Sequence, residues 1–310
     1  MSAATTDVLL DRLCAGAAED GRWGYRPGST PAAEPTAVAC LALGACDARL
    51  AQRNRALTWL ARLQRPNGAV PITADVTGPC WPTALALLAW LSEARAPGSG
   101  FHRPIHRAAS RLLELRGIRL PLDKRIFGHD TTLQGWPWVS GTHSWVEPTA
   151  FAISALRTAG RGDHPHVREA VRLLLDRALP EGGWNYGNTR VLSHYLRPFP
   201  ATTGIALTAL AGEADSPKIA AAASYLSSEL EGVRSPLSMA WGVIGLTAVD
   251  RRPPAADDWL RDVADRAILR EADNLSIALL LLARCAWRPA SSSAPAHQAV
   301  LERAEASSRE

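Results

Sequence analysis

Six times along this 310-residue chain, a helix-start signal follows a turn rich in Trp, Gly or Pro and leads into an apolar run. The six signals are Glu34-Pro35-Thr36-Ala37, Trp81-Pro82-Thr83-Ala84, Glu147-Pro148-Thr149-Ala150, Pro200-Ala201-Thr202-Thr203, Ser235-Pro236-Leu237-Ser238 and Asp273-Asn274-Leu275-Ser276. Such self-similarity indicates one supersecondary unit used repeatedly. It also predicts where function lies, because six equivalent loops gather at one end of the molecule.

Two kinds of helical segment alternate along the chain. The segments after the six signals are apolar on every side, which indicates inner helices surrounded by protein. The segments between them carry charge on one face and Leu or Ala on the other, as outer helices do. These amphipathic segments are residues 8–18, 53–63, 104–115, 167–178, 218–230 and 257–269. The alternation predicts an all-α (α/α)6 toroid of six helical hairpins, with a single domain over 1–290 and a polar tail at 291–310.

Composition and charge narrow the function classes. The net charge of +4 is small and scattered, which argues against a nucleic-acid surface. The first twelve residues lack a basic start followed by a long apolar core, so they do not read as a signal peptide. The longest apolar runs are too short to span a membrane. We therefore expect a cytoplasmic protein, and the sequence leaves attachment to a membrane surface open.

The five cysteines give no metal-ligand pattern. They are Cys14, Cys40, Cys46, Cys80 and Cys285. The count is odd and no CxxC pair occurs, so the simplest interpretation is a reduced chain with small buried thiols. Since zinc sites need closer spacing, we expect neither a metal nor another cofactor.

Loop lengths point to the working end. The connections from an outer helix to the next inner helix are long and carry most of the aromatic residues, notably over residues 117–146 and 181–199. Long loops in a compact domain are usually functional. They lie at the amino ends of the inner helices, where free N–H groups and partial positive charge occur.

Certain motifs in these loops resemble a known repeat. The segment Ala56-Leu57-Thr58-Trp59-Leu60-Ala61-Arg62-Leu63-Gln64, followed by Asn67-Gly68-Ala69, resembles the repeat of squalene–hopene cyclases and protein prenyltransferase β subunits. In that repeat an outer helix ends in Gln, and Gly and an aromatic residue follow; here Val70 stands where Trp is usual. Partial copies occur at 19–23, 135–150 and 181–186, and the likeness spans roughly residues 5–290.

The resemblance implies a terpenoid-cyclase-like toroid with an aromatic-lined cavity for an isoprenoid chain. It does not bring the catalytic signatures of that superfamily. The Asp-x-Asp-Asp string of class II cyclases is absent, as are the Asp-x-Cys pair that holds zinc in prenyltransferases and the Asp-rich magnesium motif of class I enzymes. The scaffold is therefore expected, and the chemistry has to be sought in other residues.

Two groups of loop residues are candidates for binding substrate. The aromatic group offers apolar contact and indole faces that stabilise a cation; its members are Trp23, Tyr25, Trp81, Trp136, Trp138, Trp145 and Trp184. The second group is a dense polar and aromatic run whose arginines could hold an anionic head group such as a diphosphate; its members are Asn185, Tyr186, Arg190, Tyr195 and Arg197. The structural alternatives are Gln–Trp packing between repeats for the first group and a solvated loop for the second.

Four residues are candidates for proton chemistry. Asp130 lies in the longest loop and is the preferred acid, with His143 or His194 holding it in a reactive state or acting itself. Glu147 is a further candidate, but the helix dipole at its position favours the ionised form and would lower its pKa. Glu34 occupies the equivalent place in the first repeat, which favours helix capping for both.

These observations predict a terpene-cyclase-like protein, an isomerase or lyase, acting on a linear isoprenoid or similar apolar substrate by proton-initiated cyclisation or isomerisation. Because the acid motif is missing, a non-catalytic isoprenoid- or lipid-binding toroid stays as an alternative. A carbohydrate-active (α/α)6 enzyme is a further alternative by fold analogy. The sequence also leaves a homodimer or a partner domain open.

Overall fold

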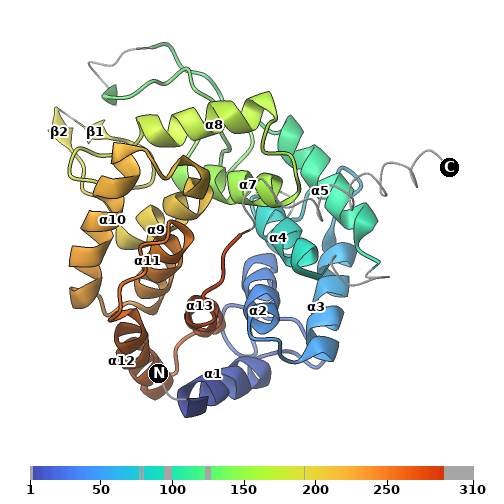
Figure 1. The fold of residues 1–310 in the computed structure, drawn as a ribbon. Helices are drawn as coiled ribbons and strands as arrows, with labels where there is room; N and C mark the ends of the chain where they lie inside the picture. Colours follow the sequence, from blue (N-terminus) through green and yellow to red (C-terminus); the bar gives the residue numbers. More distant parts are fainter. Residues whose placement is uncertain are drawn as a thin grey trace.

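The computed structural model describes residues 3–76, 78, 80–93, 100–122, 127–191 and 193–289. Its helices form two concentric rings (Figure 1). The inner helices are α2 (Ala33–Ala45), α4 (Thr83–Glu93), α7 (Val146–Thr158), α9 (Pro200–Ala209), α11 (Pro236–Ala248) and α13 (Asn274–Arg284). The outer helices are α1 (Ala3–Ala15), α3 (Leu50–Leu63), α5 (His102–Glu114), α8 (Pro165–Asp176), α10 (Pro217–Glu229) and α12 (Ala256–Leu269).

The inner helices close a complete circle. Each packs on the next in chain order, and α13 packs on α2, so the last repeat meets the first. Nearly every residue of these helices is buried, as the continuous apolar runs predicted. The fold is therefore the (α/α)6 toroid that the six repeated signals indicated. We refer to the space enclosed by the inner helices as the lumen.

A repeated hydrogen-bonded contact joins each long turn to its inner helix. The hydroxyl oxygen of a threonine in the first turn of the inner helix accepts a hydrogen bond from a backbone N–H of the preceding long connection, at 2.9–3.0 Å. The pairs are Trp23 with Thr36, Val70 with Thr83, Trp136 with Thr149, and Trp184 with Thr203. The three tryptophans also donate their indole N–H to a carbonyl at the end of the preceding outer helix, at 2.7–2.8 Å. We call this arrangement the Trp–Thr clasp; it satisfies helix-end carbonyls that would otherwise lack partners.

Glycines in the same turns allow each repeat to touch the following outer helix. Gly68 has φ +85° and lies against the backbone of α5, and Gly182 has φ +92° and lies against that of α10. A Cβ at Gly182 would come within 2.6 Å of the Ala221 carbonyl oxygen. Gln64 reinforces the contact between Gly68 and α5, because its side-chain amide donates to the Pro104 carbonyl of that helix at 2.9 Å. The Gln–Gly repeat is thus a packing device of the outer ring.

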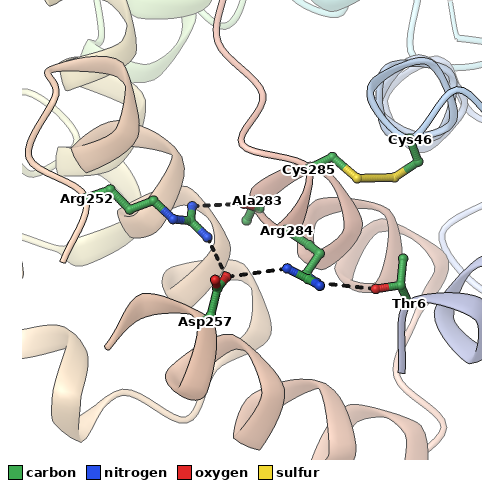
Figure 2. The surroundings of a disulfide bond; sticks show 7 residues. All are labelled: Thr6, Cys46, Arg252, Asp257, Ala283, Arg284 and Cys285. Atoms are coloured by element: carbon green, nitrogen blue, oxygen red, sulfur yellow. Dashed lines mark hydrogen bonds and ion pairs between the residues drawn. A yellow bond between two sulfur atoms is a disulfide. The ribbon is translucent and has the colours of Figure 1, made fainter. Parts of the chain in front are cut away.

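A disulfide joins the first and last repeats, contrary to the expectation of a fully reduced chain. Cys46, directly after α2, is bonded to Cys285, directly after α13 (Figure 2). The two residues are 239 positions apart in sequence, but ring closure brings the ends of their helices together. Cys14, Cys40 and Cys80 are free, as expected.

Charged side chains reinforce the same closure. Asp257 of α12 accepts from Arg252 at 2.9 Å and pairs with Arg284 of α13 at 3.6 Å. Arg284 in turn donates to Thr6 of α1, and Figure 2 shows this chain of contacts beside the disulfide.

Two segments outside the helices also bear on the sequence analysis. The 181–199 connection contains a short hairpin of β1 (Arg190–Val191) and β2 (His194–Tyr195), which sequence reasoning did not anticipate. The polar tail expected at 291–310 lies outside the described residues. Among the helices that the structure describes, none is long and apolar enough to cross a membrane.

Candidate functional site

Two carboxylates from non-adjacent helices meet at the amino end of the lumen. Glu34 lies in the first turn of α2 and Glu147 in the first turn of α7, with α4 between those helices. The Tyr25 hydroxyl donates to Glu34 Oε2 at 2.5 Å, and the Thr202 hydroxyl of α9 donates to Glu147 Oε1 at 2.7 Å. Each carboxylate thus has one oxygen bound to a hydroxyl donor.

Both carboxyl groups have raised pKa values. Burial is the main cause at Glu34, and the nearby charges of Glu147 and Asp273 add to it against the opposing Tyr25 hydrogen bond, so its pKa rises to about 7. Burial also raises the pKa of Glu147, opposed by the hydrogen bond from Thr202. The hydrogen bonds that the structure gives these two carboxylates come from hydroxyl groups and not from the first N–H groups of their helices. The expected lowering of the Glu147 pKa is wrong, because burial outweighs the opposing hydrogen bond from Thr202.

Four aromatic rings gather at the same end of the lumen as these carboxyl groups. Phe151 lies one helical turn beyond Glu147 on α7, and its ring centroid is 5.6 Å from that of Trp241 on α11. Because α9 separates those two helices in the ring, the contact crosses the lumen. Trp81 lies 6.4 Å from Phe151 and meets Trp138 edge-on at 4.9 Å. We call Trp81, Trp138, Phe151 and Trp241 the lumen aromatic cluster.

Sequence reasoning found only part of this cluster. Trp81 and Trp138 were predicted from the loops, whereas Phe151 and Trp241 were missed because both are within inner helices. The available signal was their position in the second turn of an inner helix, at a depth where side chains from helices on either side of α9 meet. The rings lie against one another, at centroid distances of 4.9–6.4 Å, and so line the space predicted beneath the long loops.

Three of the predicted substrate-binding tryptophans belong to the wall. Trp23, Trp136 and Trp184 are 0–1% exposed and form the Trp–Thr clasps between outer and inner helices. For these three the structural alternative, packing between repeats, describes what the structure shows. Trp145 is half-buried and its ring lies 4.4 Å from that of His143, at the base of the long loop.

Asp130, the acid preferred from sequence, lies in a hydrogen-bonded turn. Its Oδ1 accepts from the backbone N–H of Thr132 at 2.9 Å and from the Thr132 hydroxyl at 2.6 Å. Its own N–H donates to Asp176, and its carbonyl accepts from Arg177. These contacts fasten the long loop to the end of α8, and they give Asp130 a structural role there.

His143 contributes to a separate small cavity rather than to the lumen. The cavity, of about 160 Å³, lies between the long loop and the residues after α8 and includes His129, His143, Arg177 and Asn188 in its lining. Burial and the charge of Arg177 lower the pKa of His129 to about 4, and the same causes lower the pKa of His143. Both imidazoles are therefore neutral near pH 7.

The polar run after α8 divides into buried and exposed parts. Asn185 is buried and holds its own turn through bonds to Gly187 N–H and the Asn188 carbonyl. The remaining members of the run are exposed or half-buried on the hairpin and its flanks: Tyr186, Arg190, His194, Tyr195 and Arg197. His194 and Asp130 are not brought together by any contact that the structure describes.

No metal cluster accompanies this site. Within the described ranges, no group of three or more His, Cys, Asp or Glu side chains is placed to hold a metal ion.

Comparison with known proteins identifies the fold. No family model and no curated protein matches the sequence. Among solved structures, a variant of type II terpene cyclase MstE from Scytonema bound to its substrate, geranylgeranyl dihydroxybenzoate, superposes with a TM-score of 0.59 at 15% identity, covering 91% of this chain and 96% of that one. A protein from Actinoplanes gives a TM-score of 0.56 at 15% identity, covering 92% and 99%.

A carbohydrate enzyme has a comparable likeness. A GH8 xylobiose complex from Teredinibacter turnerae superposes with a TM-score of 0.56 at 9% identity, covering 92% of this chain and 94% of that one. At such identities the likeness concerns the fold and not the reaction. The chain therefore has the terpenoid-cyclase-like (α/α)6 toroid fold, which some carbohydrate-active enzymes share.

Proposed function

We propose that this protein is a type II terpene-cyclase-like enzyme that isomerises or cyclises a linear isoprenoid by protonating an alkene in the lumen. The observation that carries the proposal is the position of the Glu34 carboxyl in the first turn of α2, at the same end of the lumen as the lumen aromatic cluster. Its raised pKa of about 7 supports this role, because a large fraction of the group is then protonated near neutral pH. A proton donor adjacent to indole rings is the pairing that carbocation chemistry needs.

The contacts of Glu34 suit proton donation. Tyr25 donates to Oε2, which leaves Oε1 to carry the acidic proton. Transfer of that proton to the terminal double bond of an isoprenoid would give a tertiary cation and leave Glu34 as a carboxylate. Attack by the next double bond closes a ring, and loss of a proton to Glu147 ends the reaction. The product is then an isomer of the substrate, with no other reactant consumed.

The aromatic cluster has two tasks in this reaction. Each indole or phenyl face that lies next to a cation stabilises it by about 0.5–2 kcal/mol. The rings also exclude water, which would otherwise capture the cation as an alcohol. Because the rings touch in this structure, we expect an isoprenoid to enter by displacing at least one of them, and the half-buried Trp81 and Trp138 are best placed to move.

The test is incubation with linear isoprenoids of several chain lengths in D₂O, followed by gas chromatography and mass spectrometry. We expect a product of the substrate's mass plus one, because one solvent deuterium is incorporated through Glu34. Glu34→Gln should reduce turnover at least 100-fold, whereas Glu19→Gln, an exposed control at the same end, should not. Turnover that survives in Glu34→Gln would overturn the assignment.

The same experiment separates the alternatives. A lipid that stays bound after purification and emerges unconverted would indicate the non-catalytic carrier. Hydrolysis of xylo-oligosaccharides that depends on Glu34 and Glu147 would indicate a carbohydrate enzyme of the kind the GH8 likeness suggests.

A further inference from the structure

A cavity lies at the opposite end of the lumen from the long loops. It measures about 360 Å³ and opens among the carboxyl ends of α2, α4 and α7. This volume is within the range of small-molecule sites. Its apolar wall is formed mainly by Leu41, Leu88, Leu91 and Trp287. None of the sequence-based candidates lies here, because the repeated motifs are all at the other end.

The polar wall of the cavity contains a buried ion pair with one unused donor. Arg53 and Glu93 are 7% and 8% exposed and form a salt bridge. Within the part of the chain that the structure describes, the Nε–H of Arg53 has no hydrogen-bond partner. That Nε has almost no accessible surface, so a ligand in the cavity would meet the ion pair through the other atoms of Arg53 and Glu93 that line it. A buried ion pair in the cavity wall favours a ligand with a polar head group there.

The charge balance selects the kind of oxygen. Arg53 is already neutralised by Glu93, and Arg288, the other cation among the described lining residues, pairs with Asp250. A carboxylate or phosphate head would bring a negative charge with no free counter-charge. A hydroxyl head can accept from Arg53 and donate to the Glu93 carboxylate. We propose that this cavity binds the uncharged, hydroxyl-bearing head of an amphipathic ligand, with its apolar tail against the leucine wall.

The segment after α13 forms a lid over this cavity. Trp287, Arg288 and Pro289 line it, and Figure 1 shows the chain crossing the ring from α13 toward α4 and α7. The disulfide holds the start of this segment to the end of α2 (Figure 2). Farther along, Arg288 pairs with Asp250 at 2.5 Å. Reduction of the disulfide would remove the covalent attachment and leave only these weaker contacts.

Binding can be measured without turnover. We would titrate the full chain at pH 8 with geranylgeraniol and with geranylgeranoic acid, which share a tail and differ in the head, and follow tryptophan fluorescence and native mass spectra. The alcohol should bind one to one, and the acid at least tenfold more weakly. Ala45→Trp, which fills the cavity from the last residue of α2, should abolish binding, whereas Ala61→Trp on outer helix α3 should not. Equal or tighter binding of the acid, unchanged binding by Ala45→Trp, or no binding of either probe would overturn the proposal.

The lid has its own test. Reduction with a phosphine should raise the dissociation rate of the alcohol at least fivefold, and a Cys46→Ser/Cys285→Ser variant should already release it fast and be insensitive to the reductant. An unchanged rate would show that the segment is not a lid. The site also rests in part on the proposed function, since the tail points along the lumen, but the two fail separately. Glu34→Gln should bind the alcohol normally while losing turnover. If only the proposed function is wrong, the wild type binds the alcohol but turns over no isoprenoid. If only the cavity proposal is wrong, the alcohol does not bind in the cavity, whatever the turnover.

Discussion

Removal of one hydroxyl from a Trp–Thr clasp gives the most direct test of how the ring is held together. Thr203 is fully buried, and its hydroxyl accepts from Trp184 N–H at 2.9 Å and donates to the Trp184 carbonyl at 3.2 Å. Thr203→Val keeps the shape of the side chain but removes both bonds. The Trp184 carbonyl retains a second donor, the Phe199 N–H at 2.8 Å, whereas the Trp184 N–H loses its acceptor.

The size of the loss follows from that single orphaned donor. A buried N–H without a partner costs about 1–3 kcal/mol, so we expect the free energy of unfolding to fall by about 2 kcal/mol. Thr208→Val on the same helix is the matched control. The Thr208 hydroxyl donates only to the Ile205 carbonyl within α9, which the helix itself can satisfy, so its removal should cost less than about 0.5 kcal/mol.

Urea denaturation followed by circular dichroism measures both variants. We expect a lower midpoint for Thr203→Val with an unchanged dependence on urea, which indicates lost stability without a change in the surface exposed on unfolding. Equal losses for the two variants would refute the reasoning, because the clasp would then be no stronger than an ordinary hydroxyl contact inside a helix.

Three further predictions concern packing, the disulfide and pH. Gly204→Ala would place a Cβ against a carbonyl of α11 and should destabilise by more than about 2 kcal/mol, whereas Gly232→Ala, with nothing within 4 Å, should be nearly neutral in the same denaturation assay. Replacing Cys46 and Cys285 by Ser should lower stability by roughly 3–5 kcal/mol relative to the oxidised wild type, and the reduced wild type should match the variant. Since Glu34 has a folded pKa of about 7 against an ordinary 4.5, the folded state keeps a proton that the unfolded state loses, so stability should fall as pH rises from about 5 to 7. Glu34→Gln should reduce that slope and leave the part due to Glu147, whose pKa is also raised.

The fold could be predicted from sequence because its determinants are local and repeated. Each inner helix begins within a few residues of its signal, and the helical periodicity separates the two rings without any knowledge of contacts. Gln64 and Gly68 likewise proved to mark the contact between outer helices. Such features can be recognised in the sequence because each acts within one repeat or between neighbouring repeats.

The disulfide and the lumen aromatic cluster depend on ring closure, and for that reason they were missed. Cys46 and Cys285 each directly follow an inner helix, the first and the last, and only a closed ring makes those two helices neighbours. In the same way, Phe151 and Trp241 read as ordinary core residues of separate helices until the curvature of the ring brings α7 and α11, on either side of α9, to face one lumen. The sequence signal for the disulfide and for the aromatic cluster was the equivalent position of these residues in different repeats, and not their spacing along the chain.

The carboxylate pair shows why equivalence between repeats changes chemistry as well as packing. A single glutamate in the first turn of an exposed helix is stabilised as an anion by about 0.3–1 kcal/mol, and that argument fits Glu34 or Glu147 taken alone. Closing the ring points equivalent positions at a common axis, so the two residues share one poorly solvated space with Asp273 nearby. Desolvation then favours the protonated form of both residues, and the charges of Glu147 and Asp273 add to it at Glu34. In a toroid, the same first-turn position in two repeats can thus hold a protonated carboxyl group, although the sequence lacks the Asp-x-Asp-Asp motif.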